Sequence, residues 1–487
     1  MDTVPVMPGD AAGPEDLARL TAAEMLAGYR ARRFTPRDVV EASIAALKRT
    51  DAACNVVVTP LYDQALAEAE RIGRDWRLGE PAGALAGLPV TVKDLVFVGG
   101  VAAKGGAPSL QDFVAPADAH VVARLREAGA IVLAKTTTCE SGYKLTADSP
   151  LTGITRNPWA LDRTSGGSSG GAAAAVAAGC GPLAIGTDGV GSIRVPSSFC
   201  GVFGLKPTFG LVSRAPGFSP PSWASLAHTG PIARSVADAA LLLEVIAGYD
   251  ARDAASLPLA PRRFDAGRRS LAGLQIGYSL DFGHAAVDPA VRAAVLAAVD
   301  VIADLGATIV PIDPGIDPEA LERILKPIAF AEQAGSVGSR TDADFAQSDP
   351  DFVAVLQAGR RHQAVAYVEA SHRRSALRAR FHDMFRSVDA LLTPTVAVTA
   401  FAAGTIGVDR IDGRAVDRHL GWSPFTWPMN LAGLPAASIP CGFDAAGLPI
   451  GLQIVAPWLG EPLILRIAAS FEAVRPWAQR RPSLAAG

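Results

Sequence analysis

Residues 163–179 read RTSGGSSGGAAAAVAAG, in which four glycines flank Ser168 and Ser169 and a run of alanines follows. Gly/Ser runs are typical of flexible linkers. This run leads directly into the alanines, which favours a structured loop that opens a helix whose small side chains pack close to their neighbours. A helix N-terminus also attracts phosphate, but the loop lacks the spacing of the phosphate-binding glycine motifs. We therefore expect a structured loop followed by a closely packed helix.

Helices and strands alternate on both sides of this loop. Residues 119–137 predict a helix that stops at Gly129 and then a strand, and the apolar run 87–100 predicts a buried strand. Further strands are expected in 388–398 and 431–457, near the end of the chain. Such alternation is typical of a layered α/β fold. Because strands occur early and late, we expect one interleaved domain.

The remaining segments read mainly as helices. Residues 14–51 predict two amphipathic helices separated at Thr35-Pro36, where threonine caps a helix and proline starts one. Residues 235–248 predict another helix. The stretch 286–387 is expected to be mainly helical, with an irregular excursion at 335–350.

Composition excludes several classes of protein. The 487 residues carry a formal net charge of −3 and no long basic run, so no nucleic-acid partner is expected. No segment has the length and apolarity of a membrane span, and the first residues do not resemble a signal peptide. The cysteines are scattered without CxxC pairs, which predicts a reducing, cytoplasmic location and no zinc site. They are Cys54, Cys139, Cys180, Cys200 and Cys441.

Two further stretches carry candidate chemistry. Residues 187–196, TDGVGSIRVP, place Ser192 on a glycine-containing turn, which is typical of a tight loop or of a nucleophile beside unshielded backbone N–H groups. Lys93 lies in the apolar run GLPVTVKD, residues 87–94. Such a lysine extends its amine to the surface, pairs with a carboxylate, or serves as a base whose pKa burial has lowered. Pairing with Asp94 is not expected, since neighbouring side chains of a strand point to opposite faces.

Taken together, these stretches resemble the amidase signature family of serine hydrolases. The resemblance also includes RNPW before the serine-rich loop, GPIARSVADAALLL after residue 229, and NLAGLPAASIPCGF near the C-terminus, and it runs from about residue 16 to 475. It implies a single α/β domain over 1–487, with a mixed, twisted central sheet covered by helices on both faces. The signature core would span about 80–250, and a helical, pocket-shaping insertion about 286–425.

The resemblance also implies a catalytic triad. Ser192 would be the nucleophile, Ser168 a bridging serine preceded by a cis peptide, and Lys93 the base, with no metal or cofactor. The backbone N–H groups of an oxyanion hole would come from Gly189, Val190, Gly191 and Ser192. Supporting roles for the loop would fall to Thr187, Asp188 and Arg194. The acyl-pocket segment CESGYK, residues 139–144, makes Gly142 and Tyr143 substrate-binding candidates beside Ser168, although Tyr143 reads equally as a surface aromatic.

One departure from the family is visible at Val190, where a glycine is common. Valine disfavours positive φ, so position 190 is expected in an ordinary backbone region. Its side chain would narrow or redirect the pocket.

We expect a stand-alone amidase acting on small hydrophobic or aryl amides, as a monomer or homodimer, with esters as side substrates. Two alternatives use the same scaffold: a urethane (carbamate) hydrolase and the A subunit of a tRNA-dependent amidotransferase. Val195 and the pair Ala227-His228 stand where the amidotransferase proteins carry other residues. A non-catalytic binding protein is disfavoured by the intact triad. Aromatic residues of the insertion belong to the core or make the pocket apolar; they are Phe330, Phe401, Trp422, Phe425 and Trp427.

Overall fold

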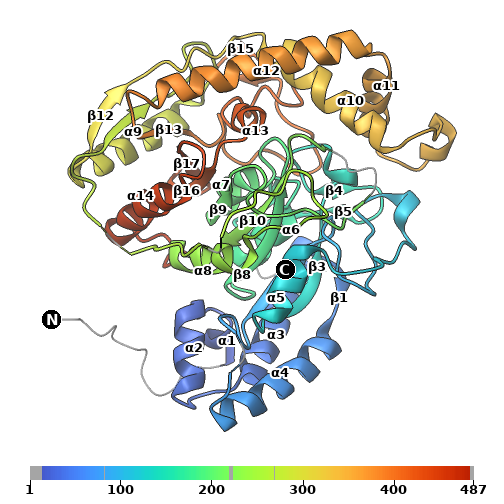
Figure 1. The fold of residues 1–487 in the computed structure, drawn as a ribbon, viewed down its shortest axis with the longest axis vertical. Coiled ribbons are helices and arrows are strands. Elements are labelled where there is room, and N and C mark those ends of the chain that lie inside the picture. Colours follow the sequence, from blue (N-terminus) through green and yellow to red (C-terminus); the bar gives the residue numbers. More distant parts are fainter. Residues whose placement is uncertain (1–13, 82, 219–222, 261, 268, 483–487) are drawn as a thin grey trace.

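The computed structural model describes the chain except for residues 1–13, 82, 219–222, 261, 268 and 483–487. Its centre is a mixed sheet of eleven strands that runs through the molecule (Figure 1). In spatial order the strands are β1 (Val57–Pro60), β3 (Ile131–Thr136), β2 (Pro89–Lys93), β8 (Leu183–Asp188), β10 (His228–Ala233), β9 (Phe203–Lys206), β16 (Ala436–Phe443), β17 (Pro449–Val455), β13 (Ala390–Pro394), β11 (Gln275–Tyr278) and β12 (Thr308–Pro311).

The sheet joins the two ends of the chain into one domain. Strand β2 pairs in parallel with β3 and with β8, whereas β8, β10, β9, β16 and β17 follow one another antiparallel. The pairing of β9 with β16 connects residues more than 200 positions apart. The expectation of a single α/β domain with a mixed sheet is therefore confirmed.

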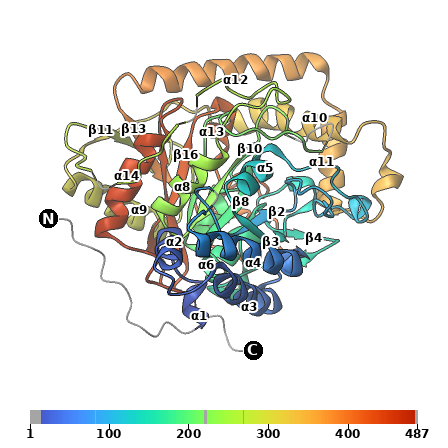
Figure 2. The ribbon, with the colours of Figure 1, turned by 60° about the horizontal axis from the view of Figure 1, so that its bottom comes forward.

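Helices cover both faces of this sheet, and Figure 2 shows α6 and α8 on opposite sides of β8. One face carries α3 (Pro36–Cys54), α6 (Gly170–Ala177) and α7 (Arg194–Cys200). The other carries α5 (His120–Glu127), α8 (Val236–Ile246), α9 (Pro289–Asp304) and α14 (Glu461–Val474). At the N-terminal side lie α1 (Pro14–Leu17), α2 (Ala22–Arg30) and α4 (Tyr62–Leu78).

A helical insertion forms the upper layer in Figures 1 and 2. Within the insertion of about 286–425, this layer contains η3 (Leu321–Leu325), α10 (Lys326–Ser336), η4 (Asp342–Phe345), α11 (Pro350–Arg360) and α12 (Ala364–Met384). The stretch 286–387 is thus mainly helical as predicted, but it also contributes the edge strand β12, which the sequence did not reveal. Helix α7 was likewise missed, because its short sequence RVPSSFC carries no helical hydrophobic repeat.

The remaining elements are short. They are η1 (Pro108–Leu110), η2 (Glu140–Gly142), β4 (Asp148–Ser149), β5 (Gly153–Ile154), β6 (Arg156–Asn157), β7 (Ala160–Thr164), β14 (Arg410–Ile411), β15 (Arg414–Ala415) and α13 (Trp427–Ala432).

Local sequence explains why the main helices begin where they do. Helix α3 has Thr35 as its N-cap, Asp38 completes a capping box, and Pro36 occupies the first turn, as the sequence predicted. Helix α6 is buried along its whole length. A Cβ atom on Gly171 would lie 2.3 Å from Thr137 Oγ1, so this close approach of helix to sheet requires glycine.

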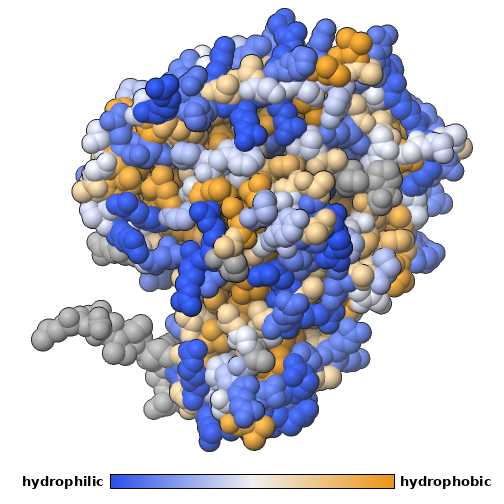
Figure 3. Space-filling model, in the orientation of Figure 1, coloured by the Kyte–Doolittle hydropathy of each residue, from blue (hydrophilic) through white to orange (hydrophobic). Residues whose placement is uncertain are grey.

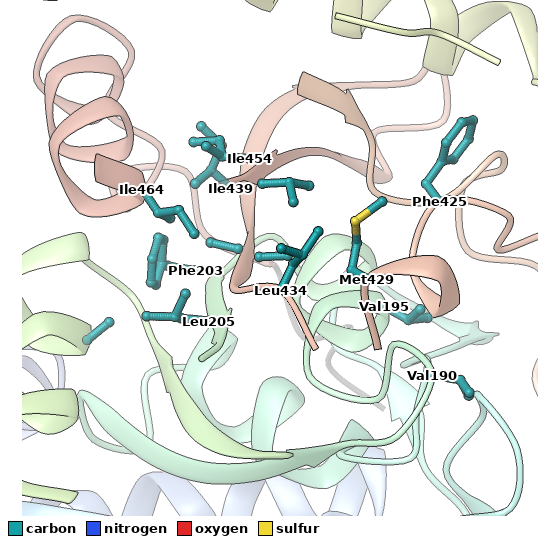
Figure 4. Packing of buried hydrophobic residues seen from close by; sticks show 14 of the residues in the cluster. Val190, Val195, Phe203, Leu205, Phe425, Met429, Leu434, Ile439, Ile454 and Ile464 are labelled. Atoms are coloured by element: carbon teal, nitrogen blue, oxygen red, sulfur yellow. The ribbon is translucent and has the colours of Figure 1, made fainter. Parts of the chain in front are cut away.

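The core follows the sheet. Figure 4 shows Phe203 and Leu205 of β9 gathered with Ile439 of β16, Ile454 of β17 and Ile464 of α14. On the surface drawn in Figure 3, hydrophilic side chains cover much of the insertion and of the N-terminal helices, with hydrophobic residues showing between them. Among the described helices, none has the length and apolarity needed to cross a membrane.

Candidate active site

The site lies where the carboxyl ends of β2 and β8 meet. Because these strands are parallel neighbours, Lys93 at the end of β2 comes beside Thr187 near the end of β8. The serine-rich loop before α6 reaches the same point. The Lys93 Nζ donates hydrogen bonds to Ser168 Oγ at 2.7 Å and to Thr187 Oγ1 at 2.8 Å. The structure therefore brings together two of the three residues of the predicted triad in direct contact.

Lys93 is completely buried, and its environment favours the neutral amine. Burial lowers the pKa of Lys93 from its ordinary value to about 7, while the thiol of Cys139 and the carboxylate of Asp188 act in the opposite direction. The neighbouring Asp94 does not neutralise Lys93. Its carboxylate accepts instead from Lys135 Nζ at 3.0 Å, as the strand geometry led us to expect. Lys93 therefore has no carboxylate among its hydrogen-bond partners within the described chain.

The serine-rich loop is fastened to the β8 loop through Ser169 as well as Ser168. The Gly167–Ser168 peptide is cis, and Ser168 is almost fully buried. Ser169 N donates to Ser192 O at 3.1 Å, and Ser169 Oγ donates to Thr187 O at 3.1 Å. The sequence analysis assigned no role to Ser169. Its contacts hold Ser168 and Ser192 on adjoining loops.

Asp188 organises the turn that carries Ser192. Its carboxylate accepts from Gly191 N at 2.7 Å and from Ile193 N at 3.2 Å. In this structure Asp188 therefore already uses the Gly191 N–H, which the resemblance implied as an oxyanion donor. The N–H groups of Gly189, Val190 and Ser192 have no protein acceptor among the described residues. Three of the four predicted donors remain available.

Arg194 forms an ion pair with the carboxylate of Asp188. Arg194 Nε donates to Asp188 Oδ2 at 2.9 Å, and both side chains are fully buried. Burial alone would raise the pKa of Asp188, but the Arg194 guanidinium holds that pKa well below its usual value. Arg194 also donates to Gln453 Oε1 at 2.7 Å and to Asn430 Oδ1 at 2.5 Å. The supporting positions predicted for Asp188 and Arg194 thus extend to two residues that the sequence analysis missed.

Val190 adopts the ordinary backbone predicted for it, while Gly191 takes the unusual φ of 137°. The Val190 side chain is 2% exposed and belongs to the hydrophobic core, and Figure 4 shows it on the loop beside Val195. Val190 is not one of the described residues that line the cavity. The expected narrowing of the pocket by this side chain is therefore not seen.

A cavity of about 560 Å³ opens beside the serines. Ser168, Ser192 and Gly189 lie in its wall together with apolar and aromatic side chains. The other lining residues are Leu95, Val96, Ala119, Val121, Ser141, Gly142, Thr187, Ser213, Arg214, Ala215, Pro216, Gly217, Phe218, Trp223, Ala224, Ala227, Thr229, Arg252, Asp253, Ala254 and Ala255.

The origin of this lining corrects one prediction. All of the lining residues come from positions 95–255, and the insertion at about 286–425 contributes none of those that the structure describes. The five aromatic residues named from the insertion are buried in the core. Of the two possibilities that the sequence left open for them, core packing is the one that the structure shows.

The segment 139–144 lies only partly on the cavity. Gly142 lines it, as predicted. Tyr143 is fully buried, with its ring centroid 5.3 Å from that of Phe352 and 6.0 Å from that of His419. The alternative of a surface aromatic is therefore wrong, and the side chain of Tyr143 is not among the described lining residues. Cys139 is also buried and is not among the described residues that line the cavity.

Histidines take structural positions near the site. His228 is buried beneath the β8 loop, where its Nδ1 lies 3.2 Å from Asp188 O and its Nε2 lies 3.3 Å from Lys206 Nζ. Burial and the neighbouring Lys206 lower the pKa of His228 well below its ordinary value. The described residues contain no group of three or more histidine, cysteine, aspartate or glutamate side chains placed to hold a metal ion.

Comparisons with known proteins agree with this architecture. The family model described as Amidase matches residues 38–465. An acylamidase of Rhodococcus erythropolis is 36% identical, over 96% of this chain and 98% of its own. The A subunit of the glutamyl-tRNA(Gln) amidotransferase of Synechococcus sp. (strain CC9605) is 38% identical, over 92% of this chain and 95% of its own.

Among solved structures, a bacterial aryl acylamidase of the amidase signature family superposes with a TM-score of 0.88 at 30% identity, covering 95% of this chain and 98% of that one. The match extends over nearly the whole length of both proteins and includes the core and the insertion. This chain belongs to the amidase family and is a hydrolase that acts on carbon–nitrogen bonds of amides.

Proposed function

We propose that this enzyme hydrolyses small hydrophobic or aryl amides through an acyl-enzyme on Ser192. The observation that carries the proposal is the 2.7 Å contact between Lys93 Nζ and Ser168 Oγ. The amine in this contact has a pKa near 7, and Ser168 lies in the same cavity wall as Ser192. A neutral amine bound to a hydroxyl is a suitable base, since a catalytic pKa close to the working pH is the most effective.

In the first step, neutral Lys93 accepts the proton of Ser168, and Ser168 accepts the proton of Ser192 as Ser192 Oγ attacks the carbonyl carbon. The new C–O bond leaves the carbonyl oxygen negatively charged. The N–H groups of Gly189, Val190 and Ser192 stabilise this oxyanion, and each such donor contributes about 3 kcal/mol in comparable hydrolases.

In the second step, the C–N bond breaks and the proton returns from Lys93 through Ser168 to the leaving nitrogen. The product amine departs and Ser192 carries the acyl group. Water then attacks this ester by the same relay and releases the acid. Neither step requires an imidazole or a metal ion.

The walls of the cavity support the substrate class. Leu95, Val121, Pro216, Phe218 and Trp223 present apolar and aromatic surface next to the serines. Pockets for small ligands typically combine apolar walls with a set of placed polar groups. Here the described charged lining residues are Arg214, Arg252 and Asp253. The acylamidase and the aryl acylamidase among the similar proteins support the same class. Esters are expected as side substrates.

We keep two alternative functions as less favoured proposals. A carbamate presents the same carbonyl beside nitrogen, and the cavity would accept it. The amidotransferase role is suggested by the 38% identical relative, but Val195 and the pair Ala227-His228 disfavour it. A panel of an aryl amide, an aliphatic amide, an N-aryl carbamate and glutamine separates these possibilities. Preference for glutamine, or dependence on a partner protein and charged tRNA, would refute the stand-alone enzyme.

The cellular setting forms part of the same proposal. All five cysteines are free and four of them are buried, which supports a protein of the reducing cytoplasm. We propose a monomer or homodimer that works without nucleic acid.

The nucleophile is tested by Ser192→Ala, with Ser197→Ala as a matched control. Ser197 lies on α7 and donates to Ile193 O at 2.7 Å, outside the cavity wall. We expect Ser192→Ala to abolish turnover and labelling by a fluorophosphonate, and Ser197→Ala to retain both. Hydrolysis at the wild-type rate by folded Ser192→Ala protein, or a label mapped to another residue, would refute the assignment.

A further inference from the structure

The aromatic residue Trp223 lies directly against the backbone of the β8 loop. A Cβ atom built on Gly189 would lie 3.3 Å from Trp223 Cγ and Cδ2, so the indole covers this part of the loop. Both residues line the cavity. Gly189 is one of the proposed oxyanion donors, and a carbonyl held there would place one of its flanking groups beside the indole.

The backbone conformation of Trp223 is unfavourable by itself. Its φ is 55°, in the left-handed region that residues with a side chain rarely adopt. Such a conformation persists only where surrounding contacts fix it. Trp223 O accepts hydrogen bonds from Leu226 N at 3.0 Å and from Ala227 N at 2.9 Å, which close a turn immediately after it.

Three of the contacts that fix this turn come from the helical insertion and converge on Ser225. Outside the insertion, Asn430 Nδ2 donates to Leu226 O at 3.2 Å and Arg214 Nη1 donates to Trp223 O at 3.5 Å. From α12, Arg374 donates to Ser225 O at 2.8 Å and to Ser225 Oγ at 2.9 Å. From α10, Glu332 accepts from Ser225 N at 3.1 Å. Thus both backbone polar groups of Ser225, two positions after Trp223, are bound by side chains of the insertion.

The two clamping side chains are themselves held. Arg374 Nε donates to Leu431 O at 2.7 Å, and Tyr367 OH donates to Glu332 Oε1 at 3.1 Å. Burial lowers the pKa of Arg374, and Glu332 acts against this effect. Arg374 is half-buried, and a guanidinium held by three directed hydrogen bonds is a rigid anchor.

We propose that Trp223 is a specificity-determining residue that selects aryl groups next to the scissile bond, and that Glu332 and Arg374 are positioning residues that hold it over Gly189. This inference rests on the proposed function. It also gives the insertion a role in specificity, although the insertion contributes none of the described residues of the cavity wall.

The test compares kcat/KM for two matched pairs: benzamide with cyclohexanecarboxamide, and acetanilide with N-cyclohexylacetamide. In the pair that the enzyme turns over, we expect Trp223→Leu to lower the aryl-to-alkyl ratio about tenfold, mainly through KM for the aryl substrate. Arg374→Met and Glu332→Ala should lower the ratio in the same direction. An unchanged ratio in Trp223→Leu overturns the role of Trp223.

Three controls separate positioning from general damage. Arg378→Met changes an arginine one turn along α12 that lies over the Trp458 ring, and it should leave the ratio unchanged. Glu332→Gln keeps an oxygen for Ser225 N and should restore the wild-type ratio. Ser225→Ala keeps both backbone contacts and should change the ratio less than twofold. If Trp223→Leu alters the ratio but Arg374→Met and Glu332→Ala do not, the positioning role is overturned.

Failure of the proposed function would be recognised separately. Wild-type turnover that persists in Ser192→Ala would refute the acyl-enzyme proposal, whatever the ratio in the Trp223 variant. Turnover that disappears in Ser192→Ala, together with an unchanged ratio in Trp223→Leu, would refute this inference alone.

Discussion

Lys93 and Ser168 are 75 positions apart in the chain, yet Lys93 Nζ donates to Ser168 Oγ at 2.7 Å, and both side chains are buried. The contact forms because Lys93 ends a strand and Ser168 lies in the loop that opens α6, which packs against that strand. The same burial lowers the pKa of Lys93 to about 7. Position and basicity of the proposed base therefore have one physical origin.

The pH dependence of turnover tests this base. The neutral form of Lys93 increases as pH rises through its pKa of about 7. We therefore expect kcat/KM for an amide to rise about tenfold from pH 6 to pH 8 and to level off above pH 8. A flat profile over this interval, with the chemical step shown to limit the rate, would contradict a lysine base.

The burial of Lys93 should also make the free energy of unfolding depend on pH. Unfolded Lys93 binds its proton up to its ordinary pKa near 10.5, whereas the folded residue releases it near 7. The folded state is therefore penalised increasingly as pH falls from 10.5 to 7, and fully below 7. We expect Lys93→Met to raise the free energy of unfolding by about 2 kcal/mol at pH 7, after allowance for two lost hydrogen bonds, and to give no gain at pH 10.

Urea denaturation at the two pH values measures this difference. Lys135→Met serves as the contrast, because Lys135 is equally buried but pairs with Asp94. Its removal would leave an unpaired buried carboxylate and should cost about 3–5 kcal/mol. A Lys93→Met variant that is less stable than the wild type at pH 7 would contradict the proposal that burying the Lys93 amine destabilises the folded state.

Much of the neighbourhood of the proposed triad could be predicted from sequence, because the three residues lie in short motifs that resemble those of the family. Lys93, Ser168 and Ser192 each sit among glycines or apolar residues that mark a special backbone or a buried strand. Asn430 and Gln453 could not be placed in this way, since they reach Arg194 from more than 200 positions away. The signal for them was weak but present: each is an amide side chain within an otherwise apolar segment.

Which residues line the cavity was harder to predict from the sequence. An aromatic residue reads the same in sequence whether it packs in a core or lines a pocket. Phe425 and Trp422 became core because partners across the fold surround them, including Phe282 and Phe199. Trp223 lines the cavity because contacts from distant helices fix the turn after it, and such contacts leave no local trace.

Charge at Asp188 should matter for stability as well as for turnover. Asp188→Asn would leave the buried Arg194 guanidinium without its ion-pair partner, which should cost about 3–5 kcal/mol. It would also loosen the Gly191 turn, and we expect kcat/KM to fall at least about a hundredfold. Urea denaturation and steady-state kinetics measure the two effects. Asp265→Asn, in an exposed pair with Arg269, is the control and should change both quantities little.

The Asp188 prediction has a pH counterpart. Because Arg194 holds the pKa of Asp188 below its usual value, the ion pair stabilises the fold at neutral pH. That contribution is present above the unfolded pKa near 4 and is lost as pH falls below it. An Asp188→Asn protein with wild-type stability and full activity at pH 7 would show that the loop does not depend on this carboxylate.

Substitution of Gly142 tests whether close packing in the cavity wall affects turnover. Its φ is 69°, and a Cβ atom there would lie 2.9 Å from Leu95 Cδ1 and 3.4 Å from Ser168 Oγ. Gly447 has a similar φ of 79° but nothing within 4 Å of such a Cβ atom. Alanine at either position should therefore cost about 1 kcal/mol of stability through backbone strain. Gly142→Ala alone should displace Leu95 and crowd Ser168, so we expect kcat/KM to fall about ten- to a hundredfold. Equal activity in the two variants would mean that the contacts of Gly142 do not reach the reacting groups.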